Sequence, residues 1–97
     1  MIRKALLKDI KQIQELINSF AKDNVMLPRS LNELYDNIRD FWVYENNGKI
    51  IGCAAVHICW DNLAEIKSLA VKKNMQRKKI GTELVTRLKL LTTLQKF

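Results

Sequence analysis

A cluster of basic residues at positions 72–79 carries the strongest chemical signal in this 97-residue sequence. A helical apolar period begins just after it, with Gly81 close to the junction, so the pattern predicts a basic loop leading into a helix. Backbone N–H groups at a helix N-terminus lack partners within the helix, and the helix dipole favours an anion there. The sequence therefore predicts a phosphate-binding loop. Its five cations, with no acidic residue between them, are Lys72, Lys73, Arg77, Lys78 and Lys79.

The same basic residues have two alternative interpretations. Runs of Lys and Arg are usually solvated surface, and a formal net charge of +7 also suits nucleic acid. Aromatic side chains among the cations would support single-strand binding, but residues 72–79 contain none. This absence weighs against nucleic acid as a partner.

Two side chains in the second half of the chain could carry a proton, Glu65 and His57. Glu65 lies between Ala64 and Ile66 on a predicted strand, where a carboxylate can take the proton of an amine. The simpler interpretation of Glu65 is a solvent-facing strand residue. A two-residue turn at 61–62 would place His57 and Glu65 on opposite faces of the sheet, whereas an odd-length loop would reverse this. We therefore expect a structural or substrate-lining role for His57.

Composition narrows the class of protein. Hydrophobic residues make up 47% and charged residues 28%, which is typical of one soluble globular domain. No stretch approaches the ~20 apolar residues of a membrane span. Charges interrupt the N-terminal segment, so we expect no membrane, no secretory signal and a cytoplasmic location. Two cysteines and one histidine argue against a disulfide framework and a metal site, and we expect buried thiols without a nucleophilic role.

Apolar residues at helical spacing predict three helices. The first covers residues 9–22, the second covers 31–39, and the third follows the basic loop. Ser30 and Glu33 have the spacing of a capping box, and Pro28 ends any helix before it. The apolar faces are expected at Ile10, Ile13, Leu16, Ile17 and Phe20; at Leu31, Leu34, Tyr35 and Ile38; and at Ile80, Leu84, Leu88 and Leu91.

Four strands are predicted at residues 2–5, 41–45, 49–60 and 63–71. Asn46-Asn47-Gly48 is typical of a tight hairpin turn. The third strand is apolar on both faces, which predicts a central position, and Gly52 within it predicts a bulge or a close neighbour. In the fourth strand we expect regular alternation. The order β-α-α-β-β-β-α predicts an α+β fold in which helices cover an antiparallel meander.

This order, with a basic loop running from Gln76 to Gly81, resembles the GNAT acetyltransferase superfamily. The resemblance extends to its N-acetylglutamate synthase-like branch and covers essentially the whole chain. Four segments in the right order carry it, namely 26–30 (MLPRS), 33–41 (ELYDNIRDF), 52–57 (GCAAVH) and 63–71 (LAEIKSLAV).

The resemblance implies acetyl-CoA as cofactor and a small-molecule amine as acceptor, with glutamate as the typical substrate of this branch. Glu65 matches the strand acid that serves as general base, directly or through water. Arg29 could hold a substrate carboxylate, although such an Arg is usually a solvated surface residue. The implied cofactor-binding residues are Leu69, Ala70 and Val71 along the pantetheine arm, and Gln76, Arg77, Lys78, Lys79, Ile80, Gly81 and Thr82 around the pyrophosphate.

Lys79 occupies a position where the family pattern has its first glycine. A glycine there lets the backbone approach the phosphates and adopt unusual φ values. Lysine either forces a different loop path or offers a cation to the same phosphates. The sequence leaves both open.

The family pattern continues beyond the third helix with a fifth strand, a fourth helix and a closing strand pair. We therefore expect a truncated GNAT-like domain that supplies one wall of the site. The fourth strand would have an exposed edge, through which a homodimer could form. An alternative function is a catalytically silent domain that serves as a dimerisation or CoA-binding module.

Overall fold

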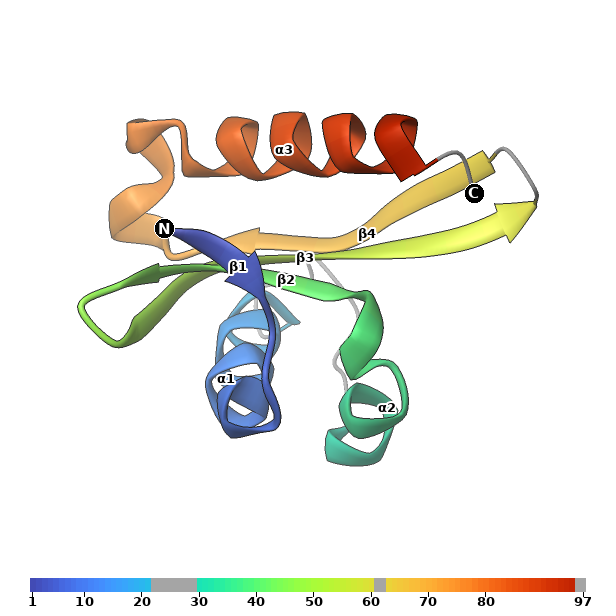
Figure 1. Ribbon diagram of the computed structural model, residues 1–97. Coiled ribbons are helices and arrows are strands. Elements are labelled where there is room, and N and C mark those ends of the chain that lie inside the picture. The colour runs from blue at the N-terminus through green and yellow to red at the C-terminus, as the bar shows by residue number, and fades with distance from the viewer. Residues whose placement is uncertain (22–29, 61–62, 96–97) are drawn as a thin grey trace.

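The computed structural model describes residues 1–21, 30–60 and 63–95. It contains one antiparallel sheet with the strand order β1-β2-β3-β4. Figure 1 shows α3 on one face of this sheet and α1 with α2 on the other. The predicted α+β class and element order are confirmed. The elements are β1 (Ile2–Lys4), α1 (Ile10–Ala21), α2 (Leu31–Asp36), β2 (Phe41–Asn46), β3 (Lys49–Trp60), β4 (Leu63–Val71) and α3 (Ile80–Gln95), with the short 3-10 helices η1 (Leu7–Asp9), η2 (Ile38–Asp40) and η3 (Lys73–Lys78).

Strand β3 is the centre of the molecule, as its apolar sequence predicts. Ile50, Cys53 and Ala55 are buried in the cluster that α1 covers. Ala54 and Val56 are buried on the opposite face, against α3. A strand with helices on both faces must be apolar on both faces, and β3 meets this requirement.

Gly52 allows α3 to approach β3 closely. A Cβ at this position would lie 3.1 Å from Ile80 Cγ2 and 3.2 Å from Leu84 Cδ1. Both partner side chains are themselves buried, so they have little room to move away. The close neighbour that the sequence predicts at Gly52 is therefore helix α3.

The helices follow the predicted apolar stripes with one exception. The five predicted core positions of α1 are all buried, and so are Ile80, Leu84 and Leu88 in α3. The side chain of Leu91, the fourth predicted position of α3, is not among the described ones. In α2, Ser30 accepts a hydrogen bond from Glu33 N–H at 3.1 Å, which confirms the cap. Helix α2 ends at Asp36, earlier than predicted, and only its Leu34 is buried, whereas Leu31 and Tyr35 are exposed. A helix of six residues has too few turns to bury a full stripe.

Regular alternation along β4 is a wrong prediction. Ile66 packs on the α3 face with Leu88, whereas Ala70 is buried in the cluster on the α1 face. Residues four apart on a regular strand share a face. The pairing explains the change, because Cys53 pairs with Ala70 while Ala55 already pairs with Lys67. Two residues of β4 thus stand opposite one residue of β3, which defines a β-bulge.

A cluster of charged side chains connects β1 and η1 to the neighbouring strand β2. Arg3 Nη1 lies 2.8 Å from Asp9 Oδ2, and Arg3 also pairs with Glu45 on β2. Asp9 is 2% exposed and accepts a further hydrogen bond from Leu6 N–H at 2.8 Å. The hydrogen bond from Arg3 lowers the pKa of the Asp9 carboxyl, against the effect of its burial. A carboxyl whose pKa is lower in the folded state stabilises the fold above its unfolded pKa and loses this effect as the pH falls.

We therefore expect Asp9→Asn to lower the free energy of unfolding by about 3 kcal/mol at pH 7, because it leaves Arg3 without its buried partner. Below about pH 4, where the carboxyl of the unfolded chain is protonated, the gap between variant and wild type should shrink. Urea denaturation at a series of pH values measures both effects. The exposed carboxyl of Glu15 on α1 offers a control, since Glu15→Gln should change stability by less than about 0.5 kcal/mol. A gap that stays constant down to pH 2 would contradict the prediction.

Candidate active site

A pocket of about 410 Å³ lies where the end of β4, the loop before α3 and the end of α1 meet. It gathers residues that are separated by up to 62 positions along the chain, since its lining includes both Phe20 of α1 and Thr82 of α3. Seven of the ten residues predicted to bind a cofactor line it. The lining consists of Phe20, Leu69, Ala70, Val71, Gln76, Lys79, Gly81 and Thr82.

Among the described side chains, no other predicted binding residue lines this pocket. Ile80 is 4% exposed and packs in the core under α3, so only its backbone can reach a ligand. Lys78 is exposed on η3 and is not part of the lining. The backbone of Arg77 lies in η3, but its side chain is not among the described atoms. Arg29 lies outside the described residues.

The start of α3 forms one rim of the pocket. Its first intrahelical bond runs from Glu83 N–H to Lys79 O at 3.0 Å. The N–H groups before Glu83 in this first turn therefore have no acceptor within the helix, and they carry the positive end of its dipole. Gly81 and Thr82 belong to this turn and to the pocket lining. This rim has the donors that an anion needs.

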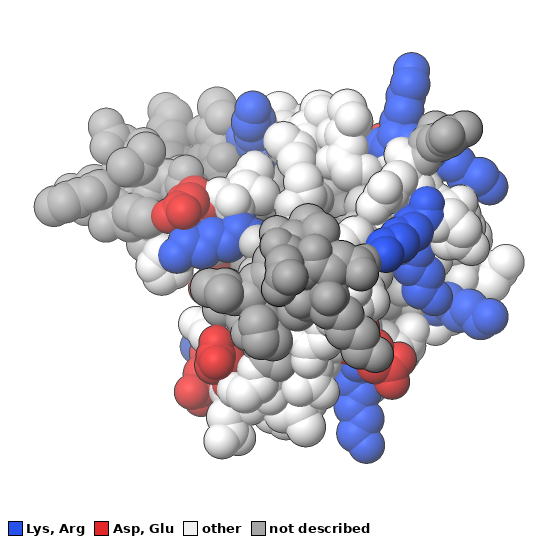
Figure 2. Space-filling view, turned by 180° about the vertical axis from the view of Figure 1, so that it is seen from behind, with Lys and Arg blue, Asp and Glu red and all other residues white. Residues whose placement is uncertain are grey.

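Lys79 resolves the question that the sequence left open about the loop path. Its φ is 61° and its ψ is 23°, which is the left-handed conformation that favours glycine. The loop thus keeps a glycine-like path and also brings a cation to the pocket. Gln76 holds the loop against the sheet, since its Nε2 donates to Val71 O at 3.1 Å. Figure 2 shows Lys and Arg side chains gathered on this side of the molecule, at the right of that view.

The bulge in β4 lies next to the pocket. Ser68 has a φ of 54°, and Ser68 with Leu69 stands opposite the single residue Ala54. Leu69 lines the pocket, and it is 40% exposed although it is apolar. A bulge interrupts the ladder and re-aims side chains and backbone groups. Here it turns the strand toward the space between β4 and α1.

The predicted opposition of His57 and Glu65 is wrong. Trp60 pairs with Leu63, so the two paired strands are two residues apart in the sequence. However, Ile58 pairs with Ala64, so Cys59 is an extra residue and His57 comes to face Glu65 directly. A shift of one residue moves side chains to the other face. Both proton carriers therefore lie on the face that α1 and α2 cover.

A smaller pocket of about 200 Å³ adjoins this pair on the α2 side of the bulge. His57 Nδ1 lies 3.6 Å from Asp40 Oδ2, and Glu65 Oε2 lies 3.8 Å from Lys67 Nζ. The Glu65 side chain is 56% exposed, so it is accessible to a ligand or to water. The lining consists of Glu33, Leu34, Asn37, Asp40, Phe41, Ala55, His57, Lys67 and Ser68. The bulge contributes to both linings, since Ser68 lines the smaller pocket and Leu69 lines the larger one.

Sequence reasoning missed Phe20 and Asp40 as pocket residues. Phe20 belongs to the apolar stripe of α1 and was expected in the core, where it is indeed 8% exposed. Its spacing gave no sign that one side of the ring also faces a pocket. Asp40 follows the second predicted helix, and no local pattern links it to His57, seventeen positions further along the chain.

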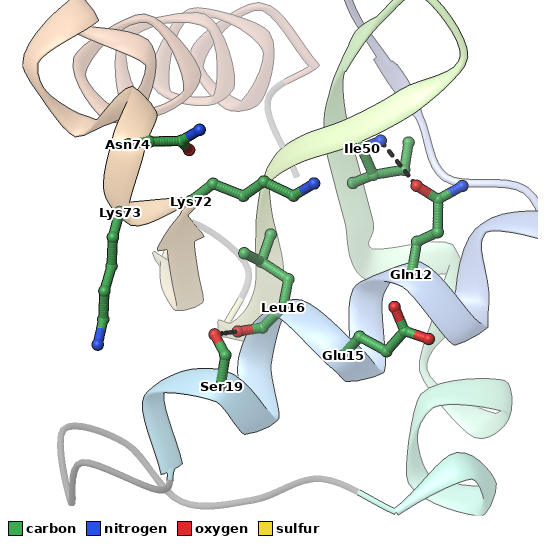
Figure 3. Close-up of a pocket in the computed structure, with 8 residues that line it drawn as sticks. All are labelled: Gln12, Glu15, Leu16, Ser19, Ile50, Lys72, Lys73 and Asn74. Carbon is green, nitrogen blue, oxygen red and sulfur yellow. Dashed lines mark hydrogen bonds between the residues drawn. The ribbon is translucent and has the colours of Figure 1, made fainter.

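A third pocket, of about 400 Å³, lies between α1 and the start of η3 (Figure 3). Lys72 extends across it toward Gln12 and Ile50, while Lys73 points away. Gln12 Oε1 accepts a hydrogen bond from Ile50 N–H at 2.9 Å and so joins α1 to β3. None of the ten predicted cofactor-binding residues is in its lining, although Lys72 and Lys73 from the predicted basic loop are. Within the described ranges, no group of three or more His, Cys, Asp or Glu side chains could hold a metal ion, and no helix is both long and apolar enough to cross a bilayer.

The fold and this site define an α+β domain with an anion-binding loop between its last strand and its last helix. Residues 7–91 match the model of the Acetyltransferase (GNAT) family, and the chain belongs to this family. Among curated relatives, an amino-acid acetyltransferase of Mycobacterium tuberculosis is 35% identical over 91 residues, which are 91% of this chain and 52% of that protein. An uncharacterised N-acetyltransferase of Chlorobaculum tepidum is 39% identical over 84 residues, or 87% of this chain and 54% of that protein. The chain spans about half the length of these two relatives.

Solved structures give the same result. A crystal structure of a Mycobacterium tuberculosis protein in complex with CoA and NLQ has a TM-score of 0.92 and 32% identity, and the match covers all of this chain and 60% of that one. An N-acetylglutamate synthase from Neisseria gonorrhoeae, complexed with coenzyme A and N-acetyl-glutamate, has a TM-score of 0.89 and 30% identity. That match covers 96% of this chain and 22% of the synthase. The predicted GNAT-like fold and its N-acetylglutamate synthase-like resemblance are both confirmed.

We expect Lys79→Gly to raise the free energy of unfolding by about 1 kcal/mol, because a side chain in the left-handed conformation is strained. The neighbouring Lys78→Gly is a matched control, since it removes the same side chain from a position without positive φ. It should lower the stability, because glycine loses more conformational freedom on folding. Thermal and urea denaturation of the two variants test this. Equal destabilisation of both would show that Lys79 is not strained.

Proposed function

We propose that this protein binds acetyl-CoA and transfers its acetyl group to the amine of a small molecule, with an amino acid such as glutamate as the acceptor. The observation that carries the proposal is the convergence of seven expected cofactor residues on one pocket at the N-terminus of α3. The curated relative from Mycobacterium tuberculosis, an amino-acid acetyltransferase, supports the acceptor class. The buried free thiol of Cys53 suits a reducing compartment such as the cytoplasm.

In this proposal the parts of the cofactor meet groups of matching chemistry. The pyrophosphate accepts hydrogen bonds from the N–H groups in the first turn of α3, and the ammonium group of Lys79 offsets its negative charge. The pantetheine arm lies along Leu69, Ala70 and Val71, whose apolar side chains and strand backbone line the same pocket. The thioester carbonyl accepts a hydrogen bond from the backbone at the bulge, where the ladder to β3 is interrupted.

Acetyl-CoA supplies an acetyl group activated as a thioester. The acceptor must reach it as a neutral amine, and Glu65 removes the proton from its ammonium form, directly or through one water. The amine nitrogen then bonds to the carbonyl carbon, and the carbon–sulfur bond breaks. The nitrogen loses its extra proton as the amide forms, and the departing thiolate takes up one proton to leave as the free thiol. His57 and Lys67 line the smaller pocket beside Glu65 and would contact the acceptor. Arg29 is our candidate for binding an acceptor carboxylate.

The edge of β4 is a proposed contact between copies. Among the described strands, β4 has a neighbour only on the β3 side. Unpaired edges associate readily with other strands. We therefore infer that a homodimer forms through this edge. Sedimentation velocity should show an average mass that rises with protein concentration, and a mass that stays that of one chain up to high micromolar concentration would refute the dimer.

We expect Glu65→Gln to lower kcat/KM for acetyl transfer by about 10²–10⁴-fold, because the amide cannot accept the amine's proton. The affinity for acetyl-CoA should stay within about twofold, since Glu65 is not part of the cofactor pocket. Calorimetric titration with acetyl-CoA and a CoA-release assay with glutamate separate the two quantities. Asp36→Asn, at an exposed carboxyl on α2, is the control and should retain activity.

Two results would count against the proposal. A wild-type chain that fails to bind acetyl-CoA at millimolar concentration would refute the cofactor site. A chain that binds acetyl-CoA but releases no CoA with any amine would instead support the silent CoA-binding module.

A further inference from the structure

Cys53 lies directly behind the bulge of β4. Its side chain is fully buried in β3, and its partner across the ladder is Ala70, the first residue after the bulge. The Cys53 thiol donates to Ser68 O, with Sγ 3.6 Å from the oxygen. The backbone of Ala70 lies near enough to the sulfur to lower the pKa of the thiol. The hydrogen bond from the thiol thus holds the carbonyl that directly precedes Leu69.

The bulge needs such support. Ser68 has a φ of 54°, a conformation that a non-glycine residue keeps only when its surroundings impose it. The carbonyl of Ser68 points inward, toward the buried sulfur. The hydrogen bond from the Cys53 thiol stabilises this orientation of the carbonyl, and so it favours the bulge over a regular strand.

We propose that Cys53 is a positioning residue, whose thiol holds the Ser68–Leu69 bulge in the shape that presents the strand backbone to the cofactor's thioester. The role toward the thioester rests on the proposed function. No covalent bond to the sulfur is made or broken, since Cys53 is 0% exposed and does not line the pocket.

The thiol can donate at any pH at which the protein works. Burial raises the pKa of Cys53 to about 12, against the opposing effect of the Ala70 N–H. The proton that bonds to Ser68 O is therefore present at neutral pH. A hydroxyl at this position could also donate and accept, whereas an alkyl group of similar size could do neither. Valine and serine at position 53 therefore test whether the hydrogen bond from the thiol matters.

The first test uses the free protein and needs no cofactor. Cys53→Val keeps the bulk but removes the hydrogen bond to Ser68 O, and Cys53→Ser keeps a donor for it. We expect Cys53→Val to shift the amide resonances of Ser68, Leu69 and Ala70 and to speed hydrogen exchange at the bulge by about tenfold, while Cys53→Ser stays close to wild type. Val43→Ala, at the buried β2 partner of Cys53, is the control for general loss of stability. It should leave the bulge resonances in place.

Bulge resonances and exchange rates in Cys53→Val that match wild type would overturn the proposal. The proposal would also fail if Val43→Ala and Cys53→Ser disturb the bulge as much as Cys53→Val does. In either case the Cys53 side chain would only fill space in the core.

The second test compares acetyl-CoA with CoA, because only the former carries the thioester carbonyl. Cys53→Val should weaken acetyl-CoA about 3- to 10-fold more than CoA, as expected for one misplaced hydrogen bond, and Cys53→Ser should restore the ratio. An equal loss for both ligands would refute a role toward the thioester. If the wild type binds neither ligand, the proposed function fails, whereas the measurements on the free protein still decide whether the thiol holds the bulge.

Discussion

The close packing of α3 on β3 at Gly52 is the constraint on which the site depends. Ile80 and Leu84 lie so near this glycine that a side chain there would require these buried neighbours to shift. Ile80 is also the first residue of α3, and Lys79 and Gly81 beside it line the larger pocket. The distance between helix and sheet thus fixes where the free N–H groups of the helix start point. The position of the anion-binding rim is a consequence of core packing.

Irregularities in the sheet place the remaining groups. The extra residue Cys59 in β3 moves His57 opposite Glu65, so that both lie on the face that α1 and α2 cover. The bulge at Ser68 and Leu69 then turns the end of β4 toward the larger pocket. On a regular ladder these groups would be distributed over both faces of the sheet. The candidate site therefore exists because the β3–β4 ladder is interrupted twice.

Much of this fold could be predicted from the sequence, because most of it follows from local patterns. Helical spacing, the Asn47-Gly48 turn and the doubly apolar β3 each reflect nearby residues. The bulges depend instead on contacts between distant segments. Cys53 and Ser68 are 15 positions apart, and no periodicity within β4 reveals that a thiol lies behind it. The same limit applies to α2, where Leu31 and Tyr35 have helical spacing but the short helix leaves them exposed.

Positive φ values occur both in the hairpin turn and at the candidate site, but for different reasons. Among the described residues, three non-glycine residues have positive φ, namely Asn47, Ser68 and Lys79. Asn47 is in a tight turn, where asparagine tolerates this conformation and needs no further explanation. Ser68 and Lys79 have no such intrinsic preference, and both lie at the pockets, one at the bulge and one at the start of α3. Strain that local sequence does not favour persists only where the surrounding structure imposes it, and it concentrates at functional sites. The two strained residues thus point to the same region as the pocket lining, by an argument that is independent of the family.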